Sequence, residues 1–219
     1  MPNFFLEQWA RIKLNAKDSP AVGIDEVGVG AWAGPLVVVA VSLPESEPWP
    51  DWYDDINDSK QLRPAKRRLL REKIVSAARF IRLEVRWPGE IDMLGLGTCH
   101  RDAIWELFLE AKRKFGVGPL VALVDGKAPV EWGYELVFVP KADTASLNVA
   151  AASIVAKVDR DRFMTEIDLT YPGYNWVKNK GYGTAEHTVA LRKLGVTPMH
   201  RRSFKPIRDI IMAGALHES

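Results

Sequence analysis

Cysteine and histidine are scarce in this chain of 219 residues, which contains one cysteine and four histidines. Cys99 has no second cysteine with which to form an internal disulfide or a cysteine-based metal site. A chain that cannot form an internal disulfide is typical of a reducing compartment, so we expect a cytoplasmic protein.

Long hydrophobic runs are also lacking. The most apolar run, residues 36–43, has eight residues and includes Ser42, whereas a helix needs roughly 20 apolar residues to span a bilayer. The first residues, MPNFFLEQWARIKLN, mix aromatic, acidic and basic side chains and have no uninterrupted apolar stretch like that of a secretory signal. We therefore expect neither export nor insertion into a membrane.

A strong excess of charge of one sign is missing as well. The formal net charge of +2 is too small to indicate a nucleic-acid partner by itself. The distribution is more informative, because residues 178–208 carry eight bases and one acid, Glu186. The bases are Lys178, Lys180, Arg192, Lys193, Arg201, Arg202, Lys205 and Arg208. This local segment, and not the net charge, therefore indicates an acidic partner.

The composition that remains is that of an ordinary globular protein, with 47% hydrophobic and 26% charged residues. This length suits one good core or two small ones, so a single domain over residues 1–219 is the expected organisation. From Tyr171 onward the chain changes character, with turn residues, aromatics and bases around one short helix near residues 185–194.

Hydrophobic periodicity predicts strands that alternate with helices. Strands are expected at residues 22–30, 36–43, 81–87, 120–126 and near 135–139, and the third should bury one face because its apolar residues alternate with charged ones. Helices are expected from near residue 64, over 101–115 and from 147 through 158. This alternation predicts an α/β or mixed-sheet domain.

Asp25 and Glu26 interrupt an otherwise apolar strand. A charged pair is costly there unless it is exposed, paired or bound to a cation. Neighbouring strand residues point to opposite faces, so both carboxylates approach one metal only near an edge, a bulge or a strand end, and Gly28 and Gly30 would permit such distortion. The alternative is a solvated acidic pair at a strand end.

Asp125 and Asp143 are two further acidic candidates. Asp125 closes a buried strand, and ligands usually gather at strand ends in open α/β sheets, although an Asp-Gly pair is also a common turn. Asp143 precedes a helix, where an aspartate is a favoured N-cap. Hard divalent cations prefer carboxylate oxygens, and four carboxylates can hold two ions about 3.5 to 4 Å apart for in-line phosphoryl displacement. No histidine or cysteine nucleophile is then needed.

The stretch GIDEVGVGAWAGPLVVVAV resembles the motif of ribonuclease HII, in which an Asp-Glu pair is followed by a Gly-Arg-Gly segment and then by Ala-Gly-Pro. The resemblance continues in the same order through DSKQL, VDG, KADTASLNVAAASIVAKVDRDRFM, YPGYNWVKNKGYGT and TPMHRRSFKPIRD. It spans roughly residues 22–208 and is far more specific than a single short motif.

This resemblance implies a ribonuclease H-like mixed β-sheet flanked by helices, with a C-terminal helical extension beside the active-site cleft. The catalytic core would cover about residues 1–170, and the substrate-binding helical part about 171–219. The implied activity is that of a monomeric endonuclease that hydrolyses the RNA strand of RNA/DNA hybrids and cuts 5′ of ribonucleotides embedded in duplex DNA.

The family's four catalytic and metal-binding carboxylates fall on Asp25, Glu26, Asp125 and Asp143, and two ions, Mg²⁺ or Mn²⁺, are expected with substrate. Asp159 and Asp161 are rival carboxylates. They lie in a helical segment that does not supply the fourth ligand in the family, so a place on a helix surface is the better interpretation of Asp159.

Substrate contacts are implied at further positions. Gly28, Val29 and Gly30 would grip the 2′-hydroxyl, the group that distinguishes RNA from DNA, through their main chain. Tyr182 would pack against a sugar near the scissile site, unless it is an ordinary half-buried tyrosine in a Gly-rich turn. Phosphate contacts are expected from Lys60, Arg201 and Arg202, each of which is otherwise a solvated charge.

Val29 departs from the family, because it stands where Gly-Arg-Gly has its arginine. The change removes five donors and a permanent charge. Main-chain contacts to the 2′-hydroxyl survive such a change, whereas an arginine–phosphate contact does not. We therefore expect weaker binding and an altered preference at single ribonucleotides or RNA–DNA junctions, with hydrolysis retained.

Three alternatives remain open. A ribonuclease HIII shares the Asp-Glu start, but only about 22 residues precede the motif here, too few for the additional N-terminal domain typical of that group. A non-catalytic binder of hybrids would be expected to have lost at least one carboxylate. A resolvase on a related fold would cut branched DNA and be indifferent to a 2′-hydroxyl.

Overall fold

A computed structural model of the chain describes residues 1–116, 118–127 and 135–215. The chain folds as two compact units. Residues 1–27, 38–84 and 104–158 form what we call the core unit, and residues 28–37, 85–103 and 159–219 form the second unit. A single domain over residues 1–219, whose last four residues lie outside the described part, stays a prediction.

The sheet has five strands in the order β3-β2-β1-β4-β5. Their bounds are β1 (Ala21–Val27), β2 (Leu36–Ser42), β3 (Phe80–Arg86), β4 (Val121–Asp125) and β5 (Leu136–Val139). Strand β4 runs parallel to β1 on one side and to β5 on the other. The five predicted strands are therefore confirmed, as is the mixed sheet flanked by helices.

The central strands are buried because they consist of small and β-branched apolar residues. All seven residues of β2 are buried, as are the first five of β1. Strand β3 departs from the prediction, since Ile81, Leu83 and Val85 are half-buried and do not alternate with exposed residues throughout. The physical reason is its position at the edge of the sheet, where only one neighbouring strand covers it.

The helices are more numerous than the periodicity predicted. They are α1 (Phe5–Lys13), α2 (Pro64–Ala77), α3 (Pro88–Leu94), α4 (Leu96–Phe115), α5 (Leu147–Thr170), α6 (Trp176–Asn179), α7 (Ala185–Leu194) and α8 (Lys205–Ala215), with 3-10 turns η1 (Asp51–Asp55) and η2 (Ala142–Thr144). Helix α4 begins five residues before the predicted start at residue 101. Helices α1, α3, α6 and α8 were not predicted.

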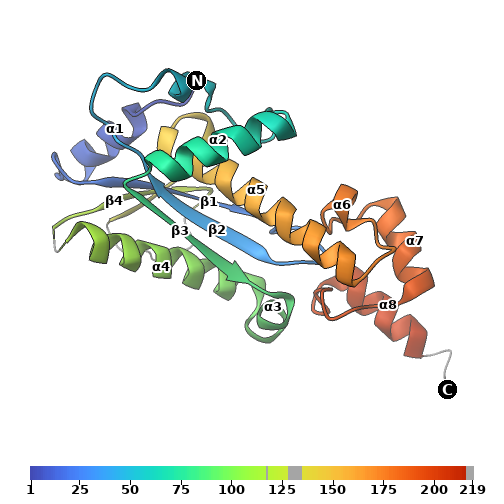
Figure 1. Cartoon of the computed structure of the whole chain (residues 1–219). Helices are drawn as coiled ribbons and strands as arrows, with labels where there is room; N and C mark the ends of the chain where they lie inside the picture. The colour runs from blue at the N-terminus through green and yellow to red at the C-terminus, as the bar shows by residue number, and fades with distance from the viewer. Residues whose placement is uncertain (117, 128–134, 216–219) are drawn as a thin grey trace. The chain divides into compact units, whose positions relative to one another are not determined.

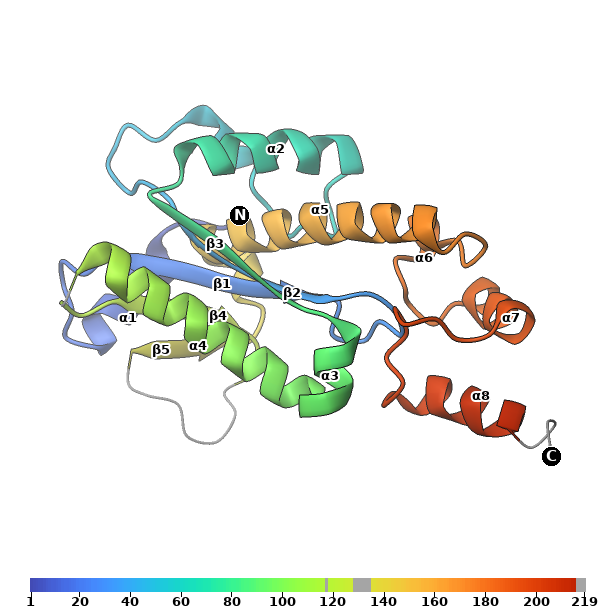
Figure 2. The ribbon, with the colours of Figure 1, turned by 60° about the horizontal axis from the view of Figure 1, so that its bottom comes forward.

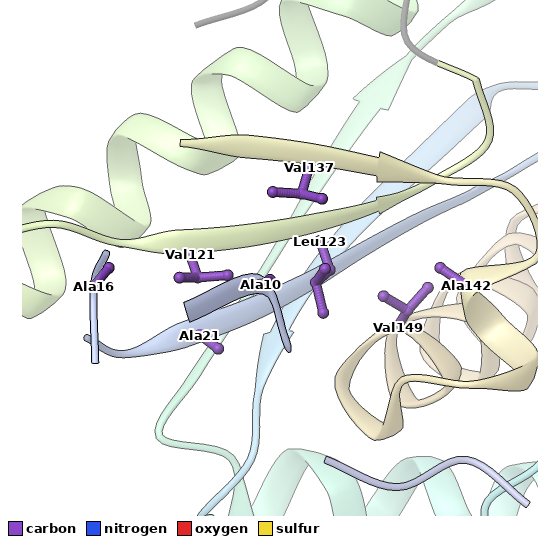
Figure 3. Close-up of a cluster of buried hydrophobic side chains, with 8 residues drawn as sticks. All are labelled: Ala10, Ala16, Ala21, Val121, Leu123, Val137, Ala142 and Val149. Atoms are coloured by element: carbon purple, nitrogen blue, oxygen red, sulfur yellow. The ribbon is translucent and has the colours of Figure 1, made fainter. Parts of the chain in front are cut away.

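Within the core unit, α2 and the first turns of α5 lie on one side of the sheet, and α4 lies on the other (Figures 1 and 2). One hydrophobic cluster joins α1 and α5 to β1, β4 and β5 (Figure 3). Its members are Ala10, Ala16, Ala21, Val121, Leu123, Val137, Ala142 and Val149. Small side chains dominate this cluster, so the elements pack closely. Gly23 of β1, for example, lies against the main chain at Asn148 and Val149, where a side chain would collide.

The second unit has its own core. Trp176, Tyr174 and Ile207 are buried in it together with Met164 of the second half of α5. The expected helical character of the C-terminal part is therefore confirmed by α6, α7 and α8. In the part of the chain that the structure describes, no helix combines the length and apolar character needed to cross a bilayer.

Candidate active site

Two predicted acidic residues lie at the carboxyl ends of neighbouring parallel strands. Ile24 of β1 is paired with Val124 of β4, so Asp25 and Asp125 follow at the next position of each strand. Residues in register on adjacent parallel strands point to the same face of a sheet. Asp25 is only 6% exposed and Asp125 is half-buried. The two carboxylates therefore share one face at one end of the sheet.

Glu26 completes the acidic pair of β1. Its main-chain N–H donates to Asp25 Oδ1 over 2.8 Å, and its side chain is half-buried. Its carboxylate raises the pKa of both Asp25 and Asp125. Glu26 therefore lies within the same electrostatic environment, although its place in the strand alternates with that of Asp25. A fully solvated acidic pair, the alternative weighed for these residues, does not fit the burial of Asp25.

Asp125 also organises the loop that carries Asp143. The N–H of Ala142 donates to Asp125 Oδ1 over 2.7 Å, immediately after Lys141, which adopts a left-handed conformation with φ of 60°. Asp143 is buried within η2 and raises the pKa of Asp125. A strand-end carboxylate thus fixes the main chain from which a second carboxylate extends.

Asp143 does not cap helix α5, which was the leading alternative for it. The capping bonds are supplied by two other residues, since Ser146 Oγ accepts from Val149 N over 3.1 Å and Glu7 Oε1 accepts from Asn148 N over 3.2 Å. The first turn of α5 is therefore capped without Asp143. Its carboxylate interacts with the N–H of Thr144 in its own turn.

The electrostatics of the cluster are those of like charges held together. Burial, followed by the carboxylates of Glu26 and Asp125, raises the pKa of Asp25 well above its usual value. Burial also raises the pKa of Asp125, with Asp143 and Glu26 adding to the effect. Such mutual elevation is typical of acidic sites that bind a cation or exchange protons.

Residues of the Asp-Ser-Lys segment adjoin this cluster. Burial and the carboxylate of Asp58 raise the pKa of Asp143, whereas the exposed ammonium of Lys60 opposes the rise at both Asp143 and Asp125. Lys60 therefore lies close enough to two of the acidic residues to affect them, and its predicted phosphate contact stays a prediction. A role for Asp58 was not predicted from the sequence, because in the Asp-Ser-Lys motif a substrate contact was assigned to Lys60 alone.

A hydroxyl pair links the same segment to the cluster. Ser59 Oγ lies 2.9 Å from Ser153 Oγ of α5, and the Ser153 side chain hydrogen-bonds Asp25 and lowers its pKa. Arg67 of α2 holds the segment from behind, donating to the Ser59 and Leu62 carbonyls. No local pattern marks these serines as site residues, because their role depends on contacts between distant parts of the chain.

The donor set fits a hard divalent cation. Carboxylate oxygens are the preferred ligands of Mg²⁺ and Mn²⁺, and a dication would neutralise like charges that otherwise raise one another's pKa. Among the described residues, no three histidine, cysteine or acidic side chains already converge as ligands of a single ion. The carboxylates share an electrostatic environment, and the ligand assignment stays a prediction.

The segment predicted to recognise the 2′-hydroxyl, residues 28–30, belongs to the second unit, where two buried arginines bind carbonyls of this segment and of the residues that follow it. Arg201 donates from Nη1 to the Val29 carbonyl over 2.9 Å and from Nε to that of Gly34 over 3.1 Å. Arg160 donates to the carbonyls of Pro35 and Ala33. Gly28 has a φ of 98°, and a side chain there would collide with Arg160.

Arg201 is therefore corrected from a surface phosphate contact to a buried support of the main chain. It is fully buried, and burial together with the neighbouring charge of Arg160 lowers its pKa to about 9. Arg202 is exposed, and its main chain is held by Asp92. The count of eight bases in residues 178–208 therefore overstates the exposed positive charge, because the sequence alone does not distinguish a buried arginine from an exposed one.

Tyr182 also lies in the second unit, and its side chain is 37% exposed. The guanidinium carbon of Arg160 lies 5.5 Å from the centre of its ring. Val29 is 40% exposed, so both residues present side-chain surface to solvent. Asp159 and Asp161, the rival carboxylates, fall in the same unit on α5 and are half-buried.

The fold is the one found in ribonucleases of the H type. Ribonuclease HII of Archaeoglobus fulgidus, solved in a complex with PCNA, shares the fold with a TM-score of 0.70 and 24% identity, over 85% of this chain and 95% of that one. Bst-RNase HIII, solved with Mn²⁺, gives a TM-score of 0.65 at 17% identity, over 89% of this chain and 70% of that one. At these identities the likeness establishes the fold alone.

Sequence comparison identifies the family. Residues 22–207 match the family model described as Ribonuclease HII. A ribonuclease HII of Thermus thermophilus is 45% identical over 187 residues, which cover 84% of this chain and 86% of that protein. That of Wolbachia pipientis from Culex pipiens is 38% identical, covering 94% and 98%. The chain belongs to the ribonuclease HII family and is an endoribonuclease.

Proposed function

We propose that this protein hydrolyses the RNA strand of RNA/DNA hybrids and cuts 5′ of ribonucleotides embedded in duplex DNA. It acts as a cytoplasmic monomer that uses two divalent ions, Mg²⁺ or Mn²⁺, held by Asp25, Glu26, Asp125 and Asp143. The observation that carries this proposal is the gathering of these acidic side chains at one end of the sheet, with raised pKa values at three of them. Family membership supports the same choice over a ribonuclease HIII.

Divalent ions supply an activated water and stabilise the leaving oxygen when they are bound. The chain's own part is to hold the ligands in place. Asp125 fixes the Asp143 turn through Ala142, and Ser153 orients Asp25. The ammonium of Lys60, close to Asp125 and Asp143, is placed to attract a backbone phosphate into the acidic site.

Selection of RNA is assigned to the second unit. The main chain of Gly28, Val29 and Gly30 binds the 2′-hydroxyl, and Tyr182 packs against the sugar. Support for this assignment comes from the main chain of this region, because the buried Arg201 binds the Val29 carbonyl and Arg160 binds that of Pro35 a few residues further on. Arg202 supplies an exposed charge for a phosphate.

The decisive experiment compares duplexes of one sequence that contain one ribonucleotide, four ribonucleotides or none, with and without divalent metal. We expect cleavage of both ribonucleotide-containing duplexes, dependence on Mg²⁺ or Mn²⁺, and no cleavage of the all-DNA duplex. Asp125→Asn should abolish cleavage and leave duplex binding largely intact, because phosphate contacts are made elsewhere. Asp159→Asn is the matched control and should remain active.

Three results would contradict the proposal. Persistent cleavage by Asp125→Asn at saturating Mg²⁺ would refute the ligand assignment. Binding of the hybrid without cleavage by the native protein would indicate a non-catalytic hybrid binder. Equal cleavage of branched DNA lacking ribonucleotides would indicate a resolvase.

A further inference from the structure

Two histidines lie in contact within the core of the second unit. His187 of α7 and His200 are both fully buried, and their Nε2 atoms are 3.1 Å apart. Trp176 donates from its indole nitrogen to His187 Nε2 over 3.1 Å, and the Tyr174 ring lies against both imidazoles. Neither histidine takes part in the proposed chemistry.

The hydrogen bonds determine where each ring carries its proton. His200 Nδ1 accepts from Thr197 N over 3.0 Å, so in the neutral ring the proton is on Nε2. That N–H faces His187 Nε2, which also accepts from the indole and therefore carries no proton. The proton of His187 is then on Nδ1, from which it donates to the Tyr182 carbonyl over 3.0 Å. Every ring nitrogen has a partner only when both rings are neutral.

Burial agrees with this assignment. Burial lowers the pKa of both histidines, and the neighbouring His187 contributes to lowering that of His200 to about 3. The titratable residues that contact the pair in the described chain are Tyr174, through its ring, and Tyr182, through its carbonyl. A proton added at His187 Nε2 would make this atom a donor that faces the N–H groups of Trp176 and His200, so three donors would meet without an acceptor.

The pair connects the two proposed recognition elements. Through His187 it binds the carbonyl of Tyr182. His200 forms a bridge with Ala33, and the next residue, Arg201, donates to the Val29 carbonyl. The Gly181 carbonyl, beside Tyr182, accepts from Trp32 and Ala33 N–H groups over 2.8 and 3.1 Å. Tyr182 and residues 29–33, which we call the Val29 segment, are thus parts of one hydrogen-bonded network.

We propose that His187 and His200 are positioning residues that hold Tyr182 relative to the Val29 segment and so determine how tightly a ribonucleotide is bound. This inference deepens the proposed function and rests on it, because it requires Tyr182 to contact the sugar. The histidines themselves touch neither substrate nor metal.

The first test is spectroscopic and uses the native protein. Long-range ¹H–¹⁵N spectra of the histidine rings near pH 7 should show His187 protonated at Nδ1 and His200 protonated at Nε2, with both rings neutral. A charged ring, or the opposite tautomer at either residue, would overturn the proposal. This measurement stands whether or not any variant folds.

The second test is a double-mutant cycle on the duplex with one ribonucleotide. His187→Phe removes the donor to Tyr182 and should raise KM about tenfold while kcat changes less than about threefold, as for a lost hydrogen bond that acts in binding. In a Tyr182→Ala background the same substitution should have less than about a twofold effect, since interacting residues are not additive. A merely structural role predicts additive losses instead.

Conservative variants separate positioning from folding. His187→Asn places an amide donor near Nδ1 and should restore KM to within about threefold of the native value, whereas His187→Gln places its amide near Nε2 and should not. Val189→Ala, on the exposed part of α7, is the control for general effects on the helix. Circular dichroism identifies variants that fail to fold, and the Asn and Gln variants then carry the cycle.

The outcomes distinguish the two proposals. If the native protein does not cut the ribonucleotide duplex, the proposed function fails, while the ring spectra still decide the hydrogen-bonded pair. If it cuts and His187→Phe keeps the native KM, or loses the same factor with and without Tyr182, the positioning role alone is refuted.

Discussion

Val29 combines an exposed side chain with a main-chain carbonyl that is held by another part of the chain. Arg201 donates to its carbonyl over 2.9 Å, and the residue is 40% exposed. A longer side chain at residue 29 therefore extends into solvent. The effect of the charge and five donors that an arginine would add can therefore be tested separately from the conformation of the main chain.

Val29→Arg should accordingly bind ribonucleotide-containing duplexes more tightly. One additional phosphate contact would steepen the dependence of log affinity on log salt by about one unit. The measurement is binding and cleavage of a single-ribonucleotide duplex and of an RNA/DNA hybrid over a range of salt, with Val29→Gln as the uncharged control. Equal activity of the native and arginine proteins on both substrates would contradict the expected role of this departure from the family.

The role of an individual residue could be predicted from the sequence where it depends only on the neighbouring residues along the chain. Asp125 could be placed at a strand end because an apolar run stops at it, and Asp25 could be singled out because it interrupts an apolar strand. The buried state of Arg201 could not, since it depends on carbonyls of Val29 and Gly34 that are distant in the chain. Ser153 was missed for the same reason, as its partner Asp25 lies on another element.

Among the elements, the five strands and the helices α2, α4, α5 and α7 were predicted, and the helices α1, α3, α6 and α8 were not. Helix α5 was expected to bury one face, but every residue from Leu147 to Ala156 is buried. A helix that is apolar all round lies in a core, where no periodic contrast remains. Helix α1 was missed because its pattern runs the other way, with Phe5 and Ile12 exposed and Glu7 buried.

Glu7 is the feature of α1 that affects stability. Its Oε1 accepts from Ser146 Oγ over 2.6 Å and from Asn148 N over 3.2 Å, so it joins α1 to the start of α5. Burial raises its pKa from 4.5 to about 7. The native state then keeps a proton that the unfolded chain loses between these values. This contribution to stability is complete below about pH 4.5 and is lost as pH rises to about 7.

Glu7→Gln should remove this pH dependence, because an amide reproduces the protonated carboxyl without titrating. The slope for one proton is about 1.4 kcal/mol per pH unit, so the variant should be the more stable protein at pH 8 and close to the native one at pH 5. Urea unfolding at both pH values measures this difference, with the exposed neighbour Gln8→Ala as control. A native protein whose stability is unchanged between pH 5 and pH 8 would contradict the assignment.

At the scale of the whole molecule, opposite charges are concentrated in different places. The net charge of +2 conceals an acidic cluster at the end of the sheet and bases elsewhere, among them the segment 178–208. The fold class was predictable, because alternating strands and helices limit the topologies available. A change of character near residue 171 was expected, but the inclusion of residues 28–37 and 85–103 in the second unit was not predictable, since it depends on contacts that no local pattern encodes.

Concentrated negative charge has a consequence for the stability of the whole chain. The pKa values of Asp25, Asp125 and Asp143 are all raised, because burial and neighbouring carboxylates oppose ionisation. A ligand that binds only the folded state stabilises it according to its concentration and affinity, by about 2.7 kcal/mol at 100 times its Kd. Unfolding disperses the four carboxylates, so a cation that needs them together meets this condition.

Adding Mn²⁺ or Mg²⁺ to metal-free protein should therefore raise the unfolding temperature, and the increase should grow with the logarithm of metal concentration above Kd. Asp125→Asn should lose most of this shift, because it removes one ligand and one charge together. Asp159→Asn removes the same charge from α5 outside the four predicted ligands and should keep the shift. Thermal unfolding of the three proteins over a metal titration makes the comparison without any measurement of activity. Equal shifts in all three proteins would mean that the ions respond only to net charge. That result would contradict the assignment of the four carboxylates as metal ligands.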